Sequence, residues 1–306
     1  MEIVVFGAGS LGSLLGGLLA RAHEVTLVGR DPHMAAIAED GLRIRGAIDD
    51  HVYPTAVTSA RGCDADVAIV TVKAYDTDAA VTALASNRYT AVLSLQNGLT
   101  EERLAAGLAG TVLAGTATYG ARLPEPGVVE CTGRGRVTIG RHGGGTDAWA
   151  ERVGKAFRDV GANALVATDM PRRRWEKLAV NAAINPLTAL TRSPNGVLAE
   201  PPLNSIARSA ARETAQTARV CGVELAADRA IEAVEAVVDA TAANRSSMLQ
   251  DVERGSRTEI GAICGAIVDR ATERGVDVPT IELLDALVTA WEREHVSGGG
   301  AGNRMK

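Results

Sequence analysis

One stretch of the chain, RRRWEKLAVNAAINPLTAL at residues 172–190, carries polar groups in a segment otherwise suited to burial. Lys177, Asn181 and Asn185 are four residues apart, so helical geometry turns each only about 40° from the last. The residues between them are Leu, Ala, Val and Ile, and Asn is a poor helix-interior residue, so two of them need another reason. An ammonium and two carboxamides on one stripe suit a wall that binds a small polar substrate. The competing interpretation is a surface lysine with two exposed asparagines.

Pro186 comes directly after this stripe and predicts a change in the helix. Proline has no N–H to donate to the carbonyl of Ala182, and its ring clashes with the preceding turn. We therefore expect the helix to kink or to end beside Asn185.

Two further polar residues, Ser247 and Glu259, lie in NRSSMLQDVERGSRTEIG at residues 244–261. Ser247 begins an S-x-x-Q capping box, so a helix start explains it as well as a chemical role does. In one unbroken helix the two residues would lie about 18 Å apart and about 120° around the axis. Both side chains can face one cleft only if the chain breaks at Gly255 and a second helix starts at Thr258.

A glycine-rich loop, GAGSLG, follows the first strand-like run and opens a helix-like run. In that context Gly7 allows the tight turn, Gly9 lets a pyrophosphate approach the backbone, and Gly12 lets helix and sheet pack closely. The helix N-terminus then offers N–H groups to the anion. The loop predicts a dinucleotide site formed by Gly7, Ala8, Gly9, Ser10, Leu11 and Gly12.

The end of the second strand-like run indicates which dinucleotide binds. NAD-binding versions of this fold place Asp or Glu there, whereas this run ends in Gly29 and Arg30, and a guanidinium suits a 2′-phosphate. Lys73, after the third strand-like run, adds a second cation, although a solvated lysine at a strand end is the alternative. The sequence favours NADPH. NADH remains open, because a shift of one residue would make Asp31 the ribose ligand.

QNGL, at residues 96–99, follows the fourth strand-like run. Asn-Gly is a common turn pair, and turn formation alone would explain it. Because carboxyl ends of parallel strands face the ligand crevice, Asn97 is an equally good candidate for contact with the nicotinamide half of the cofactor.

The overall pattern predicts an α/β protein with a Rossmann-type, mostly parallel sheet followed by an all-helical region. The first half alternates strand-like runs (IVVFG, EVTLVG, DVAIVTV, AVLSLQ and TVLAGTATYG) with amphipathic segments. VVECTG and RVTIG predict a hairpin, residues 147–160 a helix, and NALVATD a last strand. From Pro171 the pattern is helical, with breaks at Ser193–Gly196, Pro201–Pro202 and Gly255. We predict a dinucleotide-binding domain at 1–169, a helical domain at 170–295 and a disordered tail at 296–306.

Composition narrows the class of protein. Of the 306 residues 46% are hydrophobic and 23% charged, and no apolar run is long enough to span a bilayer. A formal charge of −5 does not indicate the basic surface that nucleic-acid binding requires. The four cysteines and five histidines show no metal-ligand spacing, so we expect no metal. With the first strand at Met1, we expect a cytoplasmic protein with free thiols.

Together these segments resemble the ketopantoate reductase (2-dehydropantoate 2-reductase) family. The resemblance runs from GAGSLG through TVKAYD, QNGL, GARLPEPGVVECTGRG, KLAVNAAINPLTAL, SPNG and NRSSMLQDVERGSRTEI. The glycine loop occurs in many dehydrogenases, whereas K-x3-N-x3-N-P-L-T-A and SSMLQD-x7-E are specific. The resemblance implies a Rossmann domain, a helical domain and an active site between them.

The resemblance also implies a role for each motif residue. Lys177 matches the catalytic lysine that donates the proton, and Glu259 matches the carboxylate near lysine, substrate and cofactor. The positions that match substrate contacts are Lys177, Asn181, Asn185, Asn195, Asn244 and Ser247. Gly7–Gly12, Lys73, Asn97, the backbone of Ala121 and Glu259 match cofactor contacts, and Arg30 looks like the 2′-phosphate arginine.

The implied activity is NADPH-dependent reduction of 2-dehydropantoate to (R)-pantoate, in pantothenate and coenzyme A biosynthesis. The alternatives are reduction of another 2-oxo acid on the same fold, and a non-catalytic NADPH-binding regulator. Related opine or hydroxyacid dehydrogenases are disfavoured by NPLTAL and SSMLQD. The sequence leaves the oligomeric state open, with a homodimer as one option.

Overall fold

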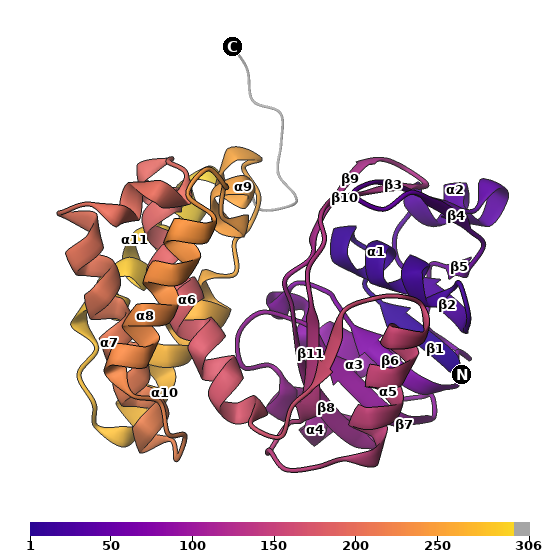
Figure 1. Cartoon of the computed structure of the whole chain (residues 1–306), viewed down its shortest axis with the longest axis horizontal. Helices are drawn as coiled ribbons and strands as arrows, with labels where there is room; N and C mark the ends of the chain where they lie inside the picture. Colours follow the sequence, from indigo (N-terminus) through magenta and orange to yellow (C-terminus); the bar gives the residue numbers. More distant parts are fainter. Residues whose placement is uncertain (297–306) are drawn as a thin grey trace. The chain divides into compact units, whose positions relative to one another are not determined.

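The computed structural model describes residues 1–296, and the chain divides into two compact units, Met1–Pro171 and Arg172–Lys306 (Figure 1). The tail that the sequence predicted to be disordered lies, from residue 297 on, outside the described residues. The first unit is built on β-sheets with covering helices and the second is helical, which confirms the predicted fold class.

The first unit contains an eight-stranded sheet in the order β12-β11-β8-β7-β6-β1-β2-β5. Its strands are β1 (Glu2–Phe6), β2 (Glu24–Val28), β5 (Thr55–Val57), β6 (Ala65–Val70), β7 (Tyr89–Ser94), β8 (Thr111–Ala117), β11 (Val137–Arg141) and β12 (Ala164–Val166). From β5 to β8 every neighbouring pair is parallel, and β11 then reverses direction against β8. The carboxyl ends of β1, β2, β6, β7 and β8 therefore share one edge, where the predicted cofactor residues follow them.

Helices cover both faces of this sheet. They are α1 (Ser10–Leu19), α2 (His33–Asp40), α3 (Thr77–Leu84), α4 (Glu101–Gly107) and α5 (Ala148–Asp159). Ile3 and Val5 point into a core with α1 and α5, while Val4 between them packs with the core that includes α3 and α4. This alternation is the two-residue period of a strand buried on both faces.

A smaller sheet in the order β4-β3-β10-β9 corrects the predicted hairpin. Its strands are β3 (Leu42–Gly46), β4 (Asp50–Val52), β9 (Gly120–Glu125) and β10 (Val128–Gly133). VVECTG is β10 and pairs with β9, whereas RVTIG enters the large sheet as β11, so the predicted pairing of these two runs is wrong. The turn of the β9–β10 hairpin is at Gly127, with φ +75°. Gly135, between VVECTG and RVTIG where the predicted hairpin would have turned, crosses the backbone of Thr118 and Tyr119 too closely for any side chain.

The second unit consists of helices. They are α6 (Met170–Thr191), α7 (Leu203–Val220), α8 (Ala227–Ala240), α9 (Ser247–Glu253), α10 (Ala266–Arg274) and α11 (Pro279–His295), with a 3-10 helix at Asn195–Ala199 and a π-helix at Gly261–Gly265. The three predicted breaks are confirmed. An ion pair between Arg208 and Glu235 joins α7 to α8, and Glu213 of α7 accepts the N–H groups of Thr280 and Ile281 at the start of α11.

Pro186 does not end α6, which continues to Thr191. Two residues further on, the Thr188 hydroxyl donates to the carbonyls of Ile184 (2.8 Å) and Asn185 (3.1 Å), in the turn that contains the proline. Burial of the flanking residues Ala182, Ala183 and Leu187 stabilises the helix through the position that lacks an N–H.

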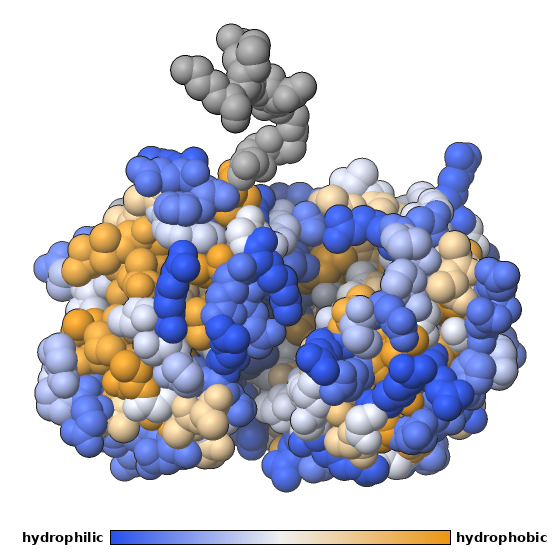
Figure 2. All heavy atoms as spheres, turned by 90° about the horizontal axis from the view of Figure 1, so that it is seen from above, coloured by the Kyte–Doolittle hydropathy of each residue, from blue (hydrophilic) through white to orange (hydrophobic). Residues whose placement is uncertain are grey.

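The surface is mixed in character. On the face drawn in Figure 2, hydrophilic side chains alternate with smaller apolar groups. Large apolar side chains that are exposed include Tyr53, Leu190, Leu283 and Leu287. Within residues 1–296, no helix combines the length and the apolar character that crossing a bilayer requires.

Candidate active site

The glycine loop after β1 is held by hydrogen bonds on both sides. Gly7 has φ +105°, and the N–H groups of Gly7 and Ala8 both donate to the carbonyl of Val28 at the end of β2 (3.0 and 2.9 Å). The Thr71 hydroxyl, after β6, donates to the carbonyl of Gly7 at 2.9 Å. A side chain at Gly12 would collide with the Gly7 carbonyl and with Thr71, so Gly12 brings α1 close to the sheet as the motif predicted.

Gly9 differs from these two glycines because the space around it is open. A Cβ there would meet only the Gly7 carbonyl, at 3.9 Å, and the residue is exposed. Gly9 is also the N-cap of the ten-residue α1 and supplies no capping side chain. An open backbone at a helix N-terminus fits the pyrophosphate of a dinucleotide.

Arg30 and Asp31, after β2, have different surroundings. Arg30 is exposed, and its guanidinium has no hydrogen-bond or ion-pair partner among the described residues. Asp31 accepts a hydrogen bond from the N–H of Ala35 (3.1 Å), so its carboxylate caps the first turn of α2.

Lys73 and Asn97 follow neighbouring strands, and Gln96 joins the two segments. Gln96 is buried, and its amide donates to the carbonyl of Val72 (3.1 Å) and to the hydroxyl of Thr77 (3.0 Å), on either side of Lys73. Gly98 has φ +81°, so the turn interpretation of QNGL accounts for its glycine. Asn97 itself is half-buried at the end of β7, at the predicted cofactor edge.

In the helical unit, Lys177, Asn181 and Asn185 all lie on α6, as the spacing predicted. Lys177 and Asn181 are half-buried, and Asn185 is 6% exposed. A surface stripe would be far more exposed, so the structure disfavours the interpretation of these residues as ordinary surface groups.

Ser246, not Ser247, caps α9. The Ser246 hydroxyl accepts the N–H of Leu249 (3.0 Å) and lies 2.7 Å from the Thr188 hydroxyl of α6. Ser247 is the first residue of the helix and is exposed, so its predicted capping role is wrong. Its hydroxyl is therefore accessible to a ligand. The Thr188–Ser246 contact places the start of α9 beside the carboxyl half of α6.

Asn195 carries a buried oxygen that has no hydrogen-bond partner in the described part of the chain. Its side chain is 6% exposed, and its Nδ2 donates to the Thr241 hydroxyl at 2.9 Å. That hydroxyl already donates to the carbonyl of Val237, so it can only accept from Asn195, and Oδ1 faces no donor. The N–H of Asn195 donates to the carbonyl of Asn244 at 2.9 Å, which brings these two predicted residues together.

The predicted break at Gly255 is confirmed. The helix α9 ends at Glu253, Gly255 has φ +62°, and the Thr258 hydroxyl accepts the N–H of Ile260, where the next helical run begins. Glu259 lies between them, 6% exposed, and its carbonyl accepts the first bonds of that run.

Comparison with known proteins identifies the family. A family model described as "Ketopantoate reductase PanE/ApbA" matches residues 3–144, and one for its C-terminal part matches residues 169–292. The chain belongs to the ketopantoate reductase PanE/ApbA family. The 2-dehydropantoate 2-reductase of Halobacterium salinarum is 41% identical over 96% of this chain and 100% of its own, and that of Archaeoglobus fulgidus is 42% identical over 95% and 98%.

Solved structures agree with this family membership. A PanE/ApbA family ketopantoate reductase from Ralstonia eutropha superposes with a TM-score of 0.89 at 31% identity, covering 96% of this chain and 99% of its own. A D-mandelate dehydrogenase bound to NADH and anilino(oxo)acetate has the same TM-score at 27% identity, with the same coverage.

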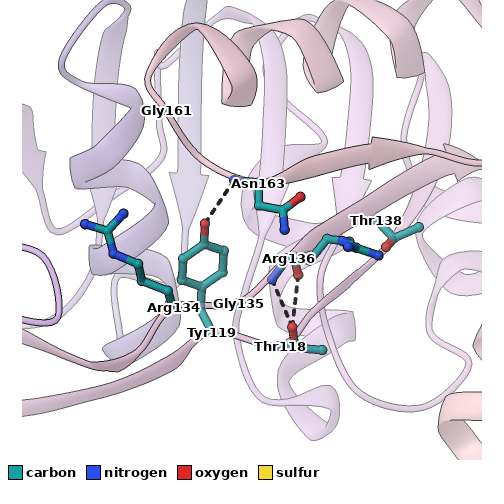
Figure 3. A pocket seen from close by; sticks show the side chains of 8 residues that line it. All are labelled: Thr118, Tyr119, Arg134, Gly135, Arg136, Thr138, Gly161 and Asn163. Atoms are coloured by element: carbon teal, nitrogen blue, oxygen red, sulfur yellow. Dashed lines mark hydrogen bonds between the residues drawn. The ribbon is translucent and has the colours of Figure 1, made fainter.

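Of the ketopantoate reductase motifs, only the end of GARLPEPGVVECTGRG, at Arg134 and Gly135, lines the pocket drawn in Figure 3. This pocket, of about 590 Å³, lies in the first unit and is lined by residues that include Tyr119, Arg134, Arg136 and Asn163. The N–H of Asn163 donates to the Tyr119 hydroxyl (3.2 Å), and Arg134 donates to the carbonyl of Ala47. The predicted cofactor residue Ala121 lies two positions beyond Tyr119, in β9.

Sequence reasoning missed the residues that hold these motifs in place. Gln96 was quoted only as part of a turn motif, and Thr188, Ser246 and Thr241 had no assigned role. Their partners are distant in sequence, for example 58 residues between Thr188 and Ser246, so no local pattern points to them.

Proposed function

We propose that this protein reduces 2-dehydropantoate to (R)-pantoate with NADPH, the step that supplies pantoate for coenzyme A. The observation that carries the proposal is the Lys177–Asn181–Asn185 stripe on α6, in the same unit as the unpartnered Oδ1 of Asn195. A substrate hydroxyl is a donor that this oxygen lacks, and 2-dehydropantoate has a terminal hydroxyl. The names of the relatives, 2-dehydropantoate 2-reductases at 41% and 42% identity, support the same substrate.

The glycine loop, Arg30, Lys73 and Asn97 would hold the cofactor, with the backbone of Ala121 as a further contact. When bound, reduced nicotinamide supplies the hydride that the C2 ketone accepts. Arg30 favours the 2′-phosphate of NADPH because it is exposed and its guanidinium has no partner within residues 1–296. Asp31 is a weaker candidate for a ribose hydroxyl because its carboxylate already caps α2.

Lys177 acts on the ketone oxygen in this mechanism. Negative charge develops on that oxygen as the carbonyl is reduced, and an ammonium both stabilises the charge and donates the proton. Arginine would supply only the charge, because it does not release its proton. Glu259 orients the ammonium or a substrate hydroxyl, and Asn181, Asn185, Asn195, Asn244 and Ser247 hold the carboxylate and the terminal hydroxyl.

A steady-state assay with 2-dehydropantoate tests the proposal. Oxidation of NADPH that depends on the ketone, with NADH giving a lower kcat/KM, is the expected result. The product of the same reaction should be identified as (R)-pantoate. Absence of ketone-dependent oxidation with either nucleotide contradicts the proposed function.

Arg30→Ala tests the cofactor choice. We expect the Kd of NADPH to rise on the order of 10-fold or more, because a charged hydrogen bond to phosphate is lost, and the Kd of NADH to change little. Titration of protein fluorescence with each nucleotide measures both constants. Equal weakening of the two nucleotides would show that Arg30 does not bind the 2′-phosphate.

A second candidate function is reduction of another 2-oxo acid on the same scaffold. The D-mandelate dehydrogenase with a TM-score of 0.89 favours it, since that enzyme is a structural neighbour over nearly the whole chain. Comparing 2-dehydropantoate with 3,3-dimethyl-2-oxobutanoate, which lacks the terminal hydroxyl, separates the two. A site built around that hydroxyl penalises the analogue strongly, whereas a general 2-oxo acid reductase accepts both.

A further inference from the structure

A buried histidine outside the family motifs joins the segments that are proposed to hold the cofactor. His33 is the first residue of α2 and is 8% exposed. Its Nε2 lies 2.9 Å from the hydroxyl of Ser13, and its Nδ1 accepts the N–H of Gly127 at 3.0 Å. The Ser13 hydroxyl lies 3.1 Å from the carbonyl of Ala8, in the glycine loop.

The position of each proton follows from these contacts. The N–H of Gly127 can only donate, so Nδ1 of His33 is unprotonated and the ring proton of neutral imidazole is on Nε2. Nε2 therefore donates to Ser13, and the Ser13 hydroxyl donates to the carbonyl of Ala8. Burial lowers the pKa of His33, which favours this neutral form.

This chain of hydrogen bonds from His33 through Ser13 to the Ala8 carbonyl, called the relay below, holds the peptide group between Ala8 and Gly9. The peptide is planar, so holding the Ala8 carbonyl toward Ser13 also sets the direction of the Gly9 N–H. The Gly9 N–H of this peptide donates to the Gly7 carbonyl at 2.6 Å, and the N–H of Ala8, in the preceding peptide, donates to the carbonyl of Val28 at 2.9 Å. The open side of Gly9, where a pyrophosphate is proposed to approach, thus belongs to a peptide that Ser13 holds at its carbonyl and the Gly7 carbonyl holds at its N–H.

The same histidine is tied to two other cofactor segments. It follows Arg30 by three residues, and Gly127 is the turn of the β9–β10 hairpin that carries Ala121. Ser13 is fully buried, so the contact between α1 and α2 is sealed from water. Three segments that are distant in sequence therefore meet at one imidazole.

We propose that His33, acting through Ser13, is a positioning residue that orients the glycine loop for the dinucleotide. An imidazole that only filled space would cost free energy on burial unless both nitrogens were paired, and an aliphatic side chain would fill the space without that cost. Both nitrogens are paired here, one of them to a group whose other bond ends on the loop. The proposal rests on the proposed function, since it assumes that the loop binds NADPH.

Two amide substitutions separate the halves of the relay. His33→Asn places an oxygen near the Nδ1 position and keeps the acceptor for Gly127, but it has no donor that reaches Ser13. His33→Gln places an amide near Nε2 and keeps the donor to Ser13. Ser13→Ala removes the last link alone. His23→Gln is the matched control, because His23 is in the same unit and bonds only to the carbonyl of Ala156 on α5.

The Kd of NADPH is measured for each variant by fluorescence titration, together with the Tm of the ligand-free protein and kcat at saturating NADPH. We expect Ser13→Ala and His33→Asn to raise the Kd about 10-fold, equivalent to about 1.4 kcal/mol. The double variant should be no weaker than either single variant, because both break one chain of bonds. His33→Gln should stay within about threefold of the wild type, and kcat should change by less than twofold in all variants.

Two results overturn the proposal. The first is an unchanged Kd in Ser13→Ala and His33→Asn, whatever happens to their Tm, since that pattern is a structural role alone. The second is an equal rise in the Kd of NADPH in His33→Gln and His33→Asn, which would show that the hydrogen bond from His33 to Ser13 does not orient the glycine loop. A wild-type protein that binds neither NADPH nor NADH overturns the cofactor assignment itself, and the role of the relay with it.

Discussion

The glycine loop and the segment around Asn195 differ in whether their buried oxygen atoms receive a hydrogen-bond donor. In the loop, the carbonyls of Gly7 and Ala8 each receive a hydroxyl donor, from Thr71 and Ser13. At Asn195, the buried Oδ1 receives none. Buried polar atoms are nearly always paired in folded proteins, and Oδ1 of Asn195 is one of the few exceptions among residues 1–296. The loop is organised without a ligand, which would lower the entropic cost of binding one, whereas we propose that a substrate completes the pairing of Asn195.

The difference predicts that nucleotide binding and chemistry can be separated by single substitutions, and Lys177→Ala should have the largest effect. We expect kcat to fall on the order of 10²- to 10⁴-fold, the usual range for loss of a proton donor. The Kd of NADPH should change little, because the loop proposed to bind it is held by hydrogen bonds that do not involve Lys177. Stopped-flow turnover and fluorescence titration measure the two quantities. Turnover close to that of the wild type would remove the proton-donor assignment.

Gly12→Ala and Gly9→Ala form a matched pair within the loop. At Gly12 the new methyl group meets the Gly7 carbonyl and Thr71, so we expect a loss of about 1–3 kcal/mol in the free energy of unfolding. At Gly9, with φ −83° and open space, we expect unchanged stability but a Kd of NADPH raised on the order of 10-fold. Urea unfolding and nucleotide titration give both values. Tight binding in Gly9→Ala would mean that the pyrophosphate does not approach there.

Asn195→Ala tests whether the unpartnered oxygen awaits the substrate hydroxyl. We expect kcat/KM for 2-dehydropantoate to fall about 10-fold, and kcat/KM for 3,3-dimethyl-2-oxobutanoate to change by less than twofold, since that analogue has no hydroxyl to lose. Asn204→Ala is the control, because Asn204 bonds only within its unit, to the carbonyl of Leu198. An equal loss on both substrates would assign Asn195 to structure instead.

The smallest expected effect is a pH dependence of stability from His33. Burial lowers its pKa in the folded protein below 6.5, so the unfolded chain binds the proton more readily. The free energy of unfolding is therefore highest above about pH 6.5, and falls as the pH drops from there toward the lowered pKa. Protonation would also turn Nδ1 into a donor facing the N–H of Gly127. Urea unfolding at pH 7.5 and pH 5.5 should show a smaller decrease in His33→Gln than in the wild type. An equal decrease would show that His33 stays neutral in both states.

Much of the local structure around the candidate site was predictable because its motifs are local. The spacing of Lys177, Asn181 and Asn185 predicted one helix and one stripe, and Gly255 predicted the break before Glu259. The same kind of reasoning failed at Ser247, because two adjacent serines both fit a cap and only the backbone decides between them. It also failed for VVECTG and RVTIG, since adjacency in sequence favoured a hairpin whereas each run had a better partner in a different sheet.

By itself, the sequence determined the alternation of strands and helices in the first unit, the glycine loop, and the polar stripe on α6, since these depend on periodicity and on residue types within a few positions. Only the tertiary structure decided that Asp31 caps a helix, that Asn195 keeps an oxygen unpaired, and that His33 joins Ser13 to Gly127. The physical reason is that a hydrogen bond is satisfied by whichever partner the fold brings near. For Gly127 and His33 that partner is 94 residues away.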